Sequence, residues 1–280
     1  MTELKAEICP ECKPVEITED QFVYPHRCPV CNIESSYVYR IKDGKTDENS
    51  SWTRCQCGVI FQDDLPTDEK VYTDKYIAEL HDAKQGKERY EYAIRTYAQL
   101  IEELTYGRMM LDVGFASPHL INAFEERGWL TWAIDINPAI TGRGNLYKGD
   151  FISYDFSLSG EKIKEATGLD KIDRKFDLIW MGHVLEHFHD PLMALKKAKD
   201  LLEEKGVLFI STPDIEFINK TGVSGWPHFK KSEHYVMFSE EALKRELERL
   251  GLKVIMMRRN FSSRYMSWWD LHCIAQQNYF

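Results

Sequence analysis

The amino-acid sequence predicts a doubly wound α/β fold with a mostly parallel sheet, preceded by a small cysteine-rich module. From residue 108 onward, short apolar runs alternate with segments of helical period, the pattern of a sheet covered by helices on both faces. Aspartate or glycine follows several of these runs, and six of the seven cysteines lie before residue 58. A chain of 280 residues with 43% hydrophobic content suffices for one large core and a small second one.

These patterns divide the chain into three segments. Residues 1–66 form the cysteine-rich module, which contains short β-prone runs. Residues 67–107 form a helical connector, because 74–105 lack proline and carry apolar residues at helical spacing, with Gly86 as a point where the helix could divide. Residues 108–280 form the α/β domain.

The strands expected in the α/β domain are apolar runs that end at polar residues or glycine. The first five alternate with helices and are expected to be parallel, and the last two are expected to pair antiparallel. In chain order they are RMMLDVG (108–114), LTWAIDI (130–136), NLYKGDF (145–151), FDLIWMGHV (176–184), VLFISTP (207–213), LKVIMMRRNF (252–261) and DLHCIAQQ (270–277).

Three helices of this domain have recognisable starts. Ser117 is expected to cap the first, with Pro118 at its first position, where a missing N–H costs nothing. Asp190 and Pro191 repeat this arrangement after the fourth strand. Ser239 is expected to cap the last helix, whose first turn carries two glutamates that suit the helix dipole.

Charge and apolar patterning restrict the class of protein. The net charge of −9 and the lack of a basic, aromatic-interleaved patch argue against a protein that grips nucleic acid. No apolar run approaches the ~20 residues that span a bilayer, and the start, MTELKAEICPEC, lacks the apolar core of a signal peptide. We therefore expect a cytoplasmic protein without a membrane partner, in which clustered thiols bind metal rather than form disulfides.

Carboxylates follow three successive strands of the predicted sheet. Asp112 lies before a sharp turn at Gly114, Asp135 ends the second strand, and Asp150 follows the third. A doubly wound sheet binds its ligand at this edge, where Asp135 would accept hydrogen bonds from a ribose diol and Asp150 one from an adenine amino group. Aspartate also ends strands for purely structural reasons, but three in succession beside a glycine turn favour a nucleoside site.

The turn after Asp112 distinguishes between nucleosides. A dinucleotide needs a glycine-rich turn whose N–H groups hold a pyrophosphate, whereas this turn carries Ala116 and Pro118, and proline has no N–H. Asp112 would also repel a diphosphate. S-adenosylmethionine has no phosphate and carries positive charge, so the acidic turn favours this methyl donor.

At this point the chain resembles a known family. LDVGFASP, AIDINP, KGDF, FDLIWMGHVLEHFHDP, GVLFISTPD and EHYVMFSEEALKRELERLGLKV are similar to successive motifs of bacterial class I S-adenosylmethionine-dependent methyltransferases, of the zinc-ribbon-bearing type common among sugar, polysaccharide and natural-product tailoring enzymes. The resemblance covers roughly residues 28–280 and implies a Rossmann-like methyltransferase fold with a mostly parallel, seven-stranded sheet. Ala116 and Pro118 stand where the family usually has glycine.

The resemblance also implies which residues contact the donor. They lie at the ends of the first four strands and in the turns that follow. These candidates are Asp112, Gly114, Phe115, Ala116, Asp135, Ile136, Asp150, Phe151 and Met181.

The candidates for proton transfer follow the fourth strand. HVLEH supplies His183, Glu186 and His187 near the expected methyl group, and a general base helps if the acceptor is a hydroxyl. Each could instead be a buried polar residue that fixes the loop, and for Glu186 that interpretation is favoured. His228 and His234, in a long loop after the fifth strand, could cover the acceptor. Trp226, Phe229 and Tyr235 could pack against it or fill the loop's own core.

The cysteines allow two metal sites, of which we predict the one formed by Cys28, Cys31, Cys55 and Cys57 as a structural zinc site. Cys28 and Cys31 form one closely spaced pair of candidate ligands, and Cys55 and Cys57 form a second. The residues after the two pairs, Asn32 and Gly58, suit the positive φ of a zinc knuckle. In the resembling family these places hold one structural zinc, although here one residue separates the second pair where two are usual. The competing set is Cys9, Cys12, Cys28 and Cys31, and reduced cysteines without metal are a third interpretation.

The function predicted from these observations is methyl transfer from S-adenosylmethionine to a small polar acceptor, a sugar or related metabolite. One alternative is a methyltransferase acting on RNA, which the acidic net charge opposes. Another is a degenerate, non-catalytic binding module, which Ala116 and Pro118 make conceivable. The sequence does not identify the acceptor or the atom that is methylated.

Overall fold

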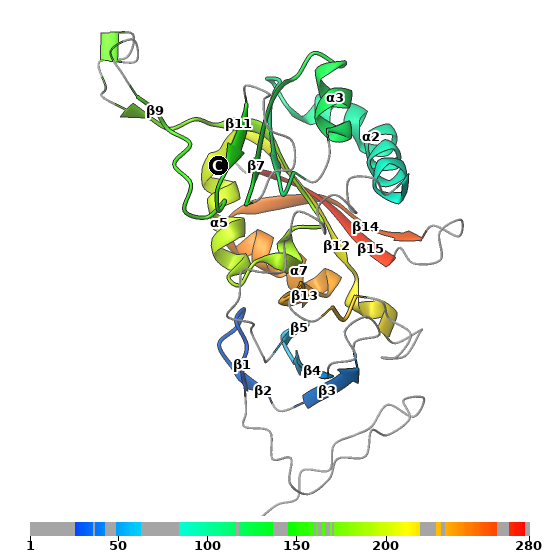
Figure 1. Ribbon diagram of the computed structural model, residues 1–280. Coiled ribbons are helices and arrows are strands. Elements are labelled where there is room, and N and C mark those ends of the chain that lie inside the picture. The colour runs from blue at the N-terminus through cyan, green and yellow to red at the C-terminus, as the bar shows by residue number, and fades with distance from the viewer. Residues whose placement is uncertain are drawn as a thin grey trace, which may run out of the picture.

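A computed structural model describes the main body of the chain (Figure 1). In the described part, no helix combines the length and the apolar character that crossing a membrane requires. The described residues are 26–35, 37–42, 49–62, 84–115, 118–136, 145–159, 161, 164–165, 169, 171–218, 228–230, 233–261 and 269–277.

The centre of the fold is a seven-stranded sheet with the strand order β14-β15-β12-β11-β6-β7-β8. Strands β12, β11, β6, β7 and β8 are mutually parallel, and β15 and β14 complete the sheet antiparallel. The predicted mostly parallel sheet is therefore confirmed. The strands are β6 (Met109–Val113), β7 (Leu130–Asp135), β8 (Leu146–Lys148), β11 (Phe176–Gly182), β12 (Leu202–Pro213), β14 (Leu252–Phe261) and β15 (Trp269–Gln277).

Helices cover both faces of this sheet. Figure 1 shows α2 and α3 on one face and α5 and α7 on the other. The helices are α2 (Lys84–Leu104), α3 (His119–Glu125), α5 (Pro191–Leu201) and α7 (Glu240–Arg249), with short 3-10 turns η2 (Leu185–His187) and η3 (Ile215–Phe217).

Alternation along β11 explains how one strand serves both faces. Leu178 and Trp180 pack into the core on the side of α2 and α3, whereas Ile179 and Met181 pack on the side of α5 and α7. Trp180 stacks on Phe209 of β12 with ring centroids 3.7 Å apart. A parallel strand buried on both faces must be apolar almost throughout, which is why this run was recognisable in the sequence.

The helix starts follow the predicted caps in two of three cases. Asp190 accepts a hydrogen bond from Met193 N at 2.9 Å, and Ser239 accepts one from Ala242 N at 3.2 Å. Helix α3 differs, because it begins at His119 and Pro118 occupies the capping position without a side-chain hydrogen bond. The prediction of Pro118 as the first helical residue was wrong by one position, and Ser117 lies outside the described residues.

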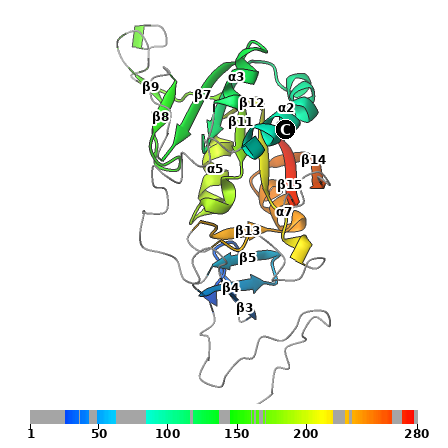
Figure 2. The same ribbon diagram turned by 45° about the vertical axis from the view of Figure 1, so that its right-hand side comes forward.

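The N-terminal module is built around a four-stranded sheet with the order β13-β5-β4-β3. Its fourth strand comes from the C-terminal segment, since β13 pairs antiparallel with β5 (Figure 2). The elements are β3 (Tyr37–Lys42), β4 (Asn49–Cys55), β5 (Val59–Gln62) and β13 (Val236–Phe238), with the two-stranded pair of β1 (His26–Arg27) and β2 (Glu34–Ser35). A separate two-stranded pair, β9 (Leu158–Ser159) with β10 (Lys171–Ile172), belongs to the α/β domain.

Further contacts hold this module against the α/β domain. Ser239 N donates to Gly58 O at 2.8 Å, and Arg245 Nη1 donates to Cys57 O at 2.9 Å. Trp52 packs edge-on against Phe229 with ring centroids 5.2 Å apart. The cysteine-bearing hairpin is thereby joined to α7 and its cap by backbone and side-chain hydrogen bonds, and strand β4 contacts the loop before β13 through an aromatic pair.

Gly58 tests how much this junction contributes to stability. Gly58 has φ +91°, and an added Cβ would lie 2.6 Å from Ser239 Oγ, whereas Gly128 has φ +83° with nothing within 4 Å. Gly128→Ala should cost about 1–2 kcal/mol for the left-handed backbone alone. Gly58→Ala should cost roughly 1–3 kcal/mol more because of the clash. Urea unfolding measures both, and equal losses would mean that the contact with α7 contributes little.

Candidate active site

The turn after β6 brings the chain close to the loop after β11. Gly114 has φ +79°, and its N–H donates to Ile134 O of β7 at 2.9 Å. A Cβ at this position would lie 2.6 Å from Val184 Cγ2. Both the backbone conformation and the close approach therefore require glycine here, as the sequence predicted.

Asp112 and Asp135 form an acidic pair beneath this turn. Asp112 is 2% exposed, and its Oδ2 has no hydrogen-bond partner among the described residues. Burial and the charge of Asp135, at the end of the neighbouring strand, raise the pKa of Asp112 well above its usual value. Such a pair binds a cationic ligand readily, because positive charge would satisfy the buried carboxylate.

Asp150 lies next to this pair, but its side chain bonds to its own turn. The backbone pairing of β8 with β7 places Gly149 N 2.9 Å from Asp135 O. The two oxygens of Asp150 accept hydrogen bonds from Ile152 N at 3.3 Å and Ser153 N at 3.1 Å. Asp150 thus has a structural role, and its remaining lone pairs still leave capacity for an adenine amino group.

The other candidate donor residues differ in exposure. Phe115, Phe151 and Met181 are buried, whereas Ile136 is 51% exposed and presents an apolar side chain directly after β7. Ala116 lies outside the described residues. Donor contact for all of these residues stays a prediction.

Glu186 is a fully buried charge at this edge of the sheet. Its Oε2 accepts a hydrogen bond from Thr212 Oγ1 at 3.0 Å. His183 Nδ1 lies 3.4 Å from the other oxygen. Burial alone would raise the pKa of Glu186, but the adjacent His183 imidazole holds it well below its usual value. Glu186 is therefore an ionised carboxylate in the interior.

His187 and His234 lie against Glu186 as a pair. Their rings are perpendicular with centroids 4.8 Å apart, and one polar side-chain atom of each lies within 4.8 Å of the other and of a Glu186 oxygen. His187 Nδ1 donates to Glu233 O at 2.7 Å, and His234 Nδ1 donates to His228 O at 2.8 Å. Because a carbonyl only accepts, these bonds fix the proton on Nδ1 and leave Nε2 as the basic atom of each ring. Burial lowers the pKa of both, so they are neutral.

His183, Glu186 and His187 were predicted together as candidates for proton transfer, and the structure gives His183 other partners than His187. The 3-10 turn Leu185–His187 leaves His183 outside it, so His183 and His187 do not share a helical face. His183 instead faces Glu186 and Asp270, with Nε2 3.1 Å from Asp270 Oδ2. No sequence pattern pointed to Asp270, because it is distant from His183 in the chain.

The N-terminal module supports this cluster through backbone hydrogen bonds. Gln62 N, at the end of β5, donates to Tyr235 O at 2.8 Å, and Tyr235 N donates to Glu186 O at 2.7 Å. Phe229 packs with Trp52 in a small core. Of its two predicted roles, contact with the acceptor or filling the loop's own core, this is the second. Trp226 lies outside the described residues.

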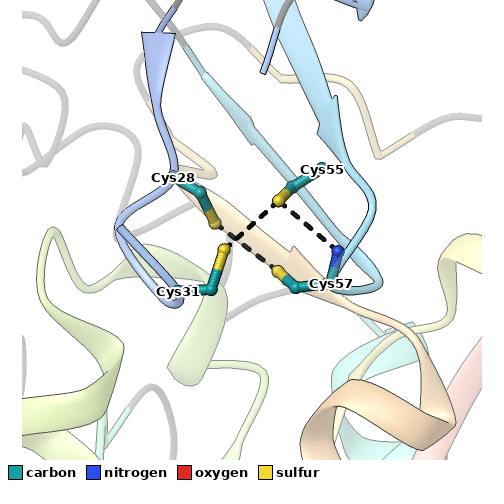
Figure 3. Close-up of side chains that lie close together, drawn as sticks. All are labelled: Cys28, Cys31, Cys55 and Cys57. Carbon is teal, nitrogen blue, oxygen red and sulfur yellow. Dashed lines mark hydrogen bonds between the residues drawn. The ribbon is translucent and has the colours of Figure 1, made fainter. Parts of the chain in front are cut away.

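Four cysteines converge at the tips of the module (Figure 3). Their sulfurs lie within 4.8 Å of one another, with Cys28 Sγ 3.6 Å from Cys57 Sγ and Cys31 Sγ 3.4 Å from Cys55 Sγ. A hydrogen bond with the Cys57 thiol lowers the pKa of Cys28 to about 5, so thiolate is available. Four sulfurs at this spacing suit a tetrahedral metal ion and leave no open position.

The backbone of both knuckles follows the prediction. Asn32 has φ +59° and Gly58 has φ +91°, the left-handed conformation expected after each cysteine pair. Cys9 and Cys12, the alternative partners, lie outside the described residues.

Comparison with known proteins assigns the chain to a family. Residues 85–256 match a family described as methyltransferase domain, which is more than half of the chain. The chain belongs to this methyltransferase family. The prediction of a methyltransferase is confirmed at this level.

Relatives of this methyltransferase include two enzymes named ubiquinone biosynthesis O-methyltransferase. The protein from Histophilus somni is 32% identical over 132 residues, which cover 45% of this chain and 52% of the relative. The protein from Pasteurella multocida is 31% identical over 146 residues, which cover 50% and 57%. The chain thus spans about half the length of these curated relatives.

A solved structure shows the same fold at low identity. It is a chain from the complex of the Haloferax volcanii Trm112 methyltransferase activator with a methyltransferase, with a TM-score of 0.51 and 14% identity. The match covers 74% of this methyltransferase and 96% of that chain. This likeness concerns the fold alone.

Proposed function

We propose that this methyltransferase moves a methyl group from S-adenosylmethionine to a hydroxyl of a small molecule. The observation that supports it most is the acidic pair Asp112–Asp135 beneath the Gly114 turn, whose buried oxygen has no partner among the described residues. His187 lies in the turn after β11, a neighbour of β6 in the sheet, and His234, from the loop before β13, packs against it. One sheet edge therefore offers negative charge for a cationic donor and lone pairs for an acceptor proton.

On the donor side, three carboxylates have complementary roles. Asp112, whose pKa burial raises, would ionise when the positively charged donor binds, and its burial would strengthen the attraction between the two charges. Asp135 would accept hydrogen bonds from the ribose hydroxyls and Asp150 one from the adenine amino group. The exposed side chain of Ile136 offers an apolar surface beside them.

On the acceptor side, His187 and His234 would take the hydroxyl proton. S-adenosylmethionine supplies an electrophilic methyl group with a good leaving group, so the residues mainly position the acceptor and accept its proton. A proton gained at Nε2 would be stabilised by ionised Glu186 nearby. The names of the relatives favour oxygen as the methylated atom. The zinc-ribbon resemblance makes a sugar or related metabolite the acceptor class we propose.

We also propose that the four cysteines bind one structural zinc ion. The convergence of the sulfurs and the left-handed backbone at Asn32 and Gly58 support this site. A closed set of four sulfurs cannot bind a reacting group, so the zinc would stabilise the module that backs Glu186 and His234.

Asp135→Ala tests the donor site. Loss of hydrogen bonds to a charged group should weaken S-adenosylmethionine binding at least tenfold, which corresponds to about 1.4 kcal/mol or more. Calorimetric titration measures this, with Asp200→Ala on α5 as a control that should bind normally. Equal affinity in Asp135→Ala would remove this residue from the site. No heat for the natural protein at millimolar donor would favour the non-catalytic binding module instead.

His187→Gln tests the acceptor side. Transfer of labelled methyl groups into a fractionated host extract should label one compound, whose identification gives the acceptor. The variant should label it roughly 10²–10⁴-fold more slowly, while donor affinity stays the same, because only the base is lost. An unchanged rate would show that His187 does not accept the proton.

Cys28→Ser tests the zinc site. The natural protein should carry one zinc ion by elemental analysis, and the variant should lose it and melt at a lower temperature. Cys273→Ser is the matched control, because Cys273 is buried in β15 away from the other sulfurs. Full zinc content in Cys28→Ser would contradict the proposed ligands.

A further inference from the structure

We propose that Asp270 is a positioning residue: through His183 it holds the carboxylate of Glu186 against His187 and His234. This proposal rests on the proposed function, because it explains how the acceptor side keeps its charge. Asp270 is the second residue of β15, a strand distant in the chain that no sequence pattern connects with HVLEH.

The geometry places His183 between two buried carboxylates. Its Nε2 lies 3.1 Å from Asp270 Oδ2, and its Nδ1 lies 3.4 Å from Glu186 Oε1. Asp270 is 1% exposed and Glu186 is fully buried. Three elements meet in this contact: the antiparallel strand β15, the end of β11 and the turn η2.

The backbone at His183 is strained in a way that serves this contact. His183 has φ +53°, a left-handed conformation that costs a residue with a Cβ about 1–2 kcal/mol. Its N–H donates to Ser211 O of β12 at 2.8 Å, which anchors the backbone while the imidazole points toward both acids. Strain of this kind persists where the surroundings fix it, and such positions cluster at functional sites.

Charge explains why both acids are needed. A neutral imidazole donates only one hydrogen bond. The lone pair on its other nitrogen would then point at the lone pairs of a carboxylate, which is repulsive. An imidazolium donates from both nitrogens, and the two acids stabilise it. His183 is then the cation that compensates Glu186, which burial alone would protonate. Glu186 in turn stays ionised beside the two neutral rings that would take the acceptor's proton.

Asp270→Asn isolates this role, because it keeps the shape and removes the charge. The measurement is the pH titration of the His183 ring by NMR on ¹⁵N-histidine-labelled full-length protein, assigned with His183→Gln. The charged or titratable groups near His183 are Asp270 from β15, Glu186 from η2 and His228 from the loop before β13.

In the natural protein, His183 should show the signals of an imidazolium at pH 7. In Asp270→Asn its titration midpoint should fall by about one to three pH units, the effect of an opposite charge at this distance. Asp214→Asn is the control, since Asp214 is also fully buried but pairs with Arg259 Nε at 2.8 Å, and it should leave His183 unchanged.

Two results would overturn the proposal: a neutral His183 at pH 7 in the natural protein, or an unchanged midpoint in Asp270→Asn. Neither depends on methyl transfer, so donor titration reports separately on the proposed function. Asp270→Asn should bind S-adenosylmethionine with natural affinity, but slow labelling of the acceptor at least tenfold. Slower labelling with an unmoved His183 midpoint would indicate a merely structural role and would also refute the proposal.

Discussion

The candidate site depends on how buried negative charge is compensated at the carboxyl edge of the sheet. Glu186 and Asp112 are two of the carboxylates buried there, and their pKa values move in opposite directions. Glu186 has internal partners in His183 and Thr212, and His183 holds its pKa low. Asp112 has no such partner for Oδ2 in the described part of the chain, and its neighbour Asp135 adds repulsion, so its pKa rises. Protein groups therefore already stabilise the charge of Glu186, whereas Asp112 would gain most from a cationic ligand.

The module with the four cysteines is not a separate unit, because it packs directly behind the residues of the candidate site. Strand β13 belongs to its sheet, and the residues just before β13, Glu233 and His234, belong to the acceptor side of the site. The connection continues through Tyr235, which joins Gln62 of the module to the backbone of Glu186. A closed sulfur site suits this arrangement, because it makes a short hairpin rigid enough to support a neighbouring loop.

Sequence patterns were sufficient wherever the interaction is local. Buried parallel strands need uninterrupted apolar runs, a cap needs its own few residues, and a cysteine knuckle needs two cysteines and a left-handed residue such as Asn32. Contacts between distant segments were not predictable, because neither the pairing of β13 with β5 nor that of Asp270 with His183 leaves a periodic signal. Asp150 is an intermediate case: its position was predicted, but not the bonds that its oxygens make to their own turn.

The two halves of the site also fit the change of charge in the proposed reaction. Asp112 would hold a positively charged donor, and methyl transfer leaves the donor's sulfur neutral, so the attraction of Asp112 weakens as soon as the product forms. At the same time the proton released by the acceptor would arrive at His187 or His234, where Glu186 compensates it. Positive charge would thus disappear beside Asp112 and appear beside Glu186, which His183 and Thr212 already contact. On the donor side this arrangement favours binding of the charged substrate and weakens as the product forms, whereas on the acceptor side it stabilises the charge that the reaction produces.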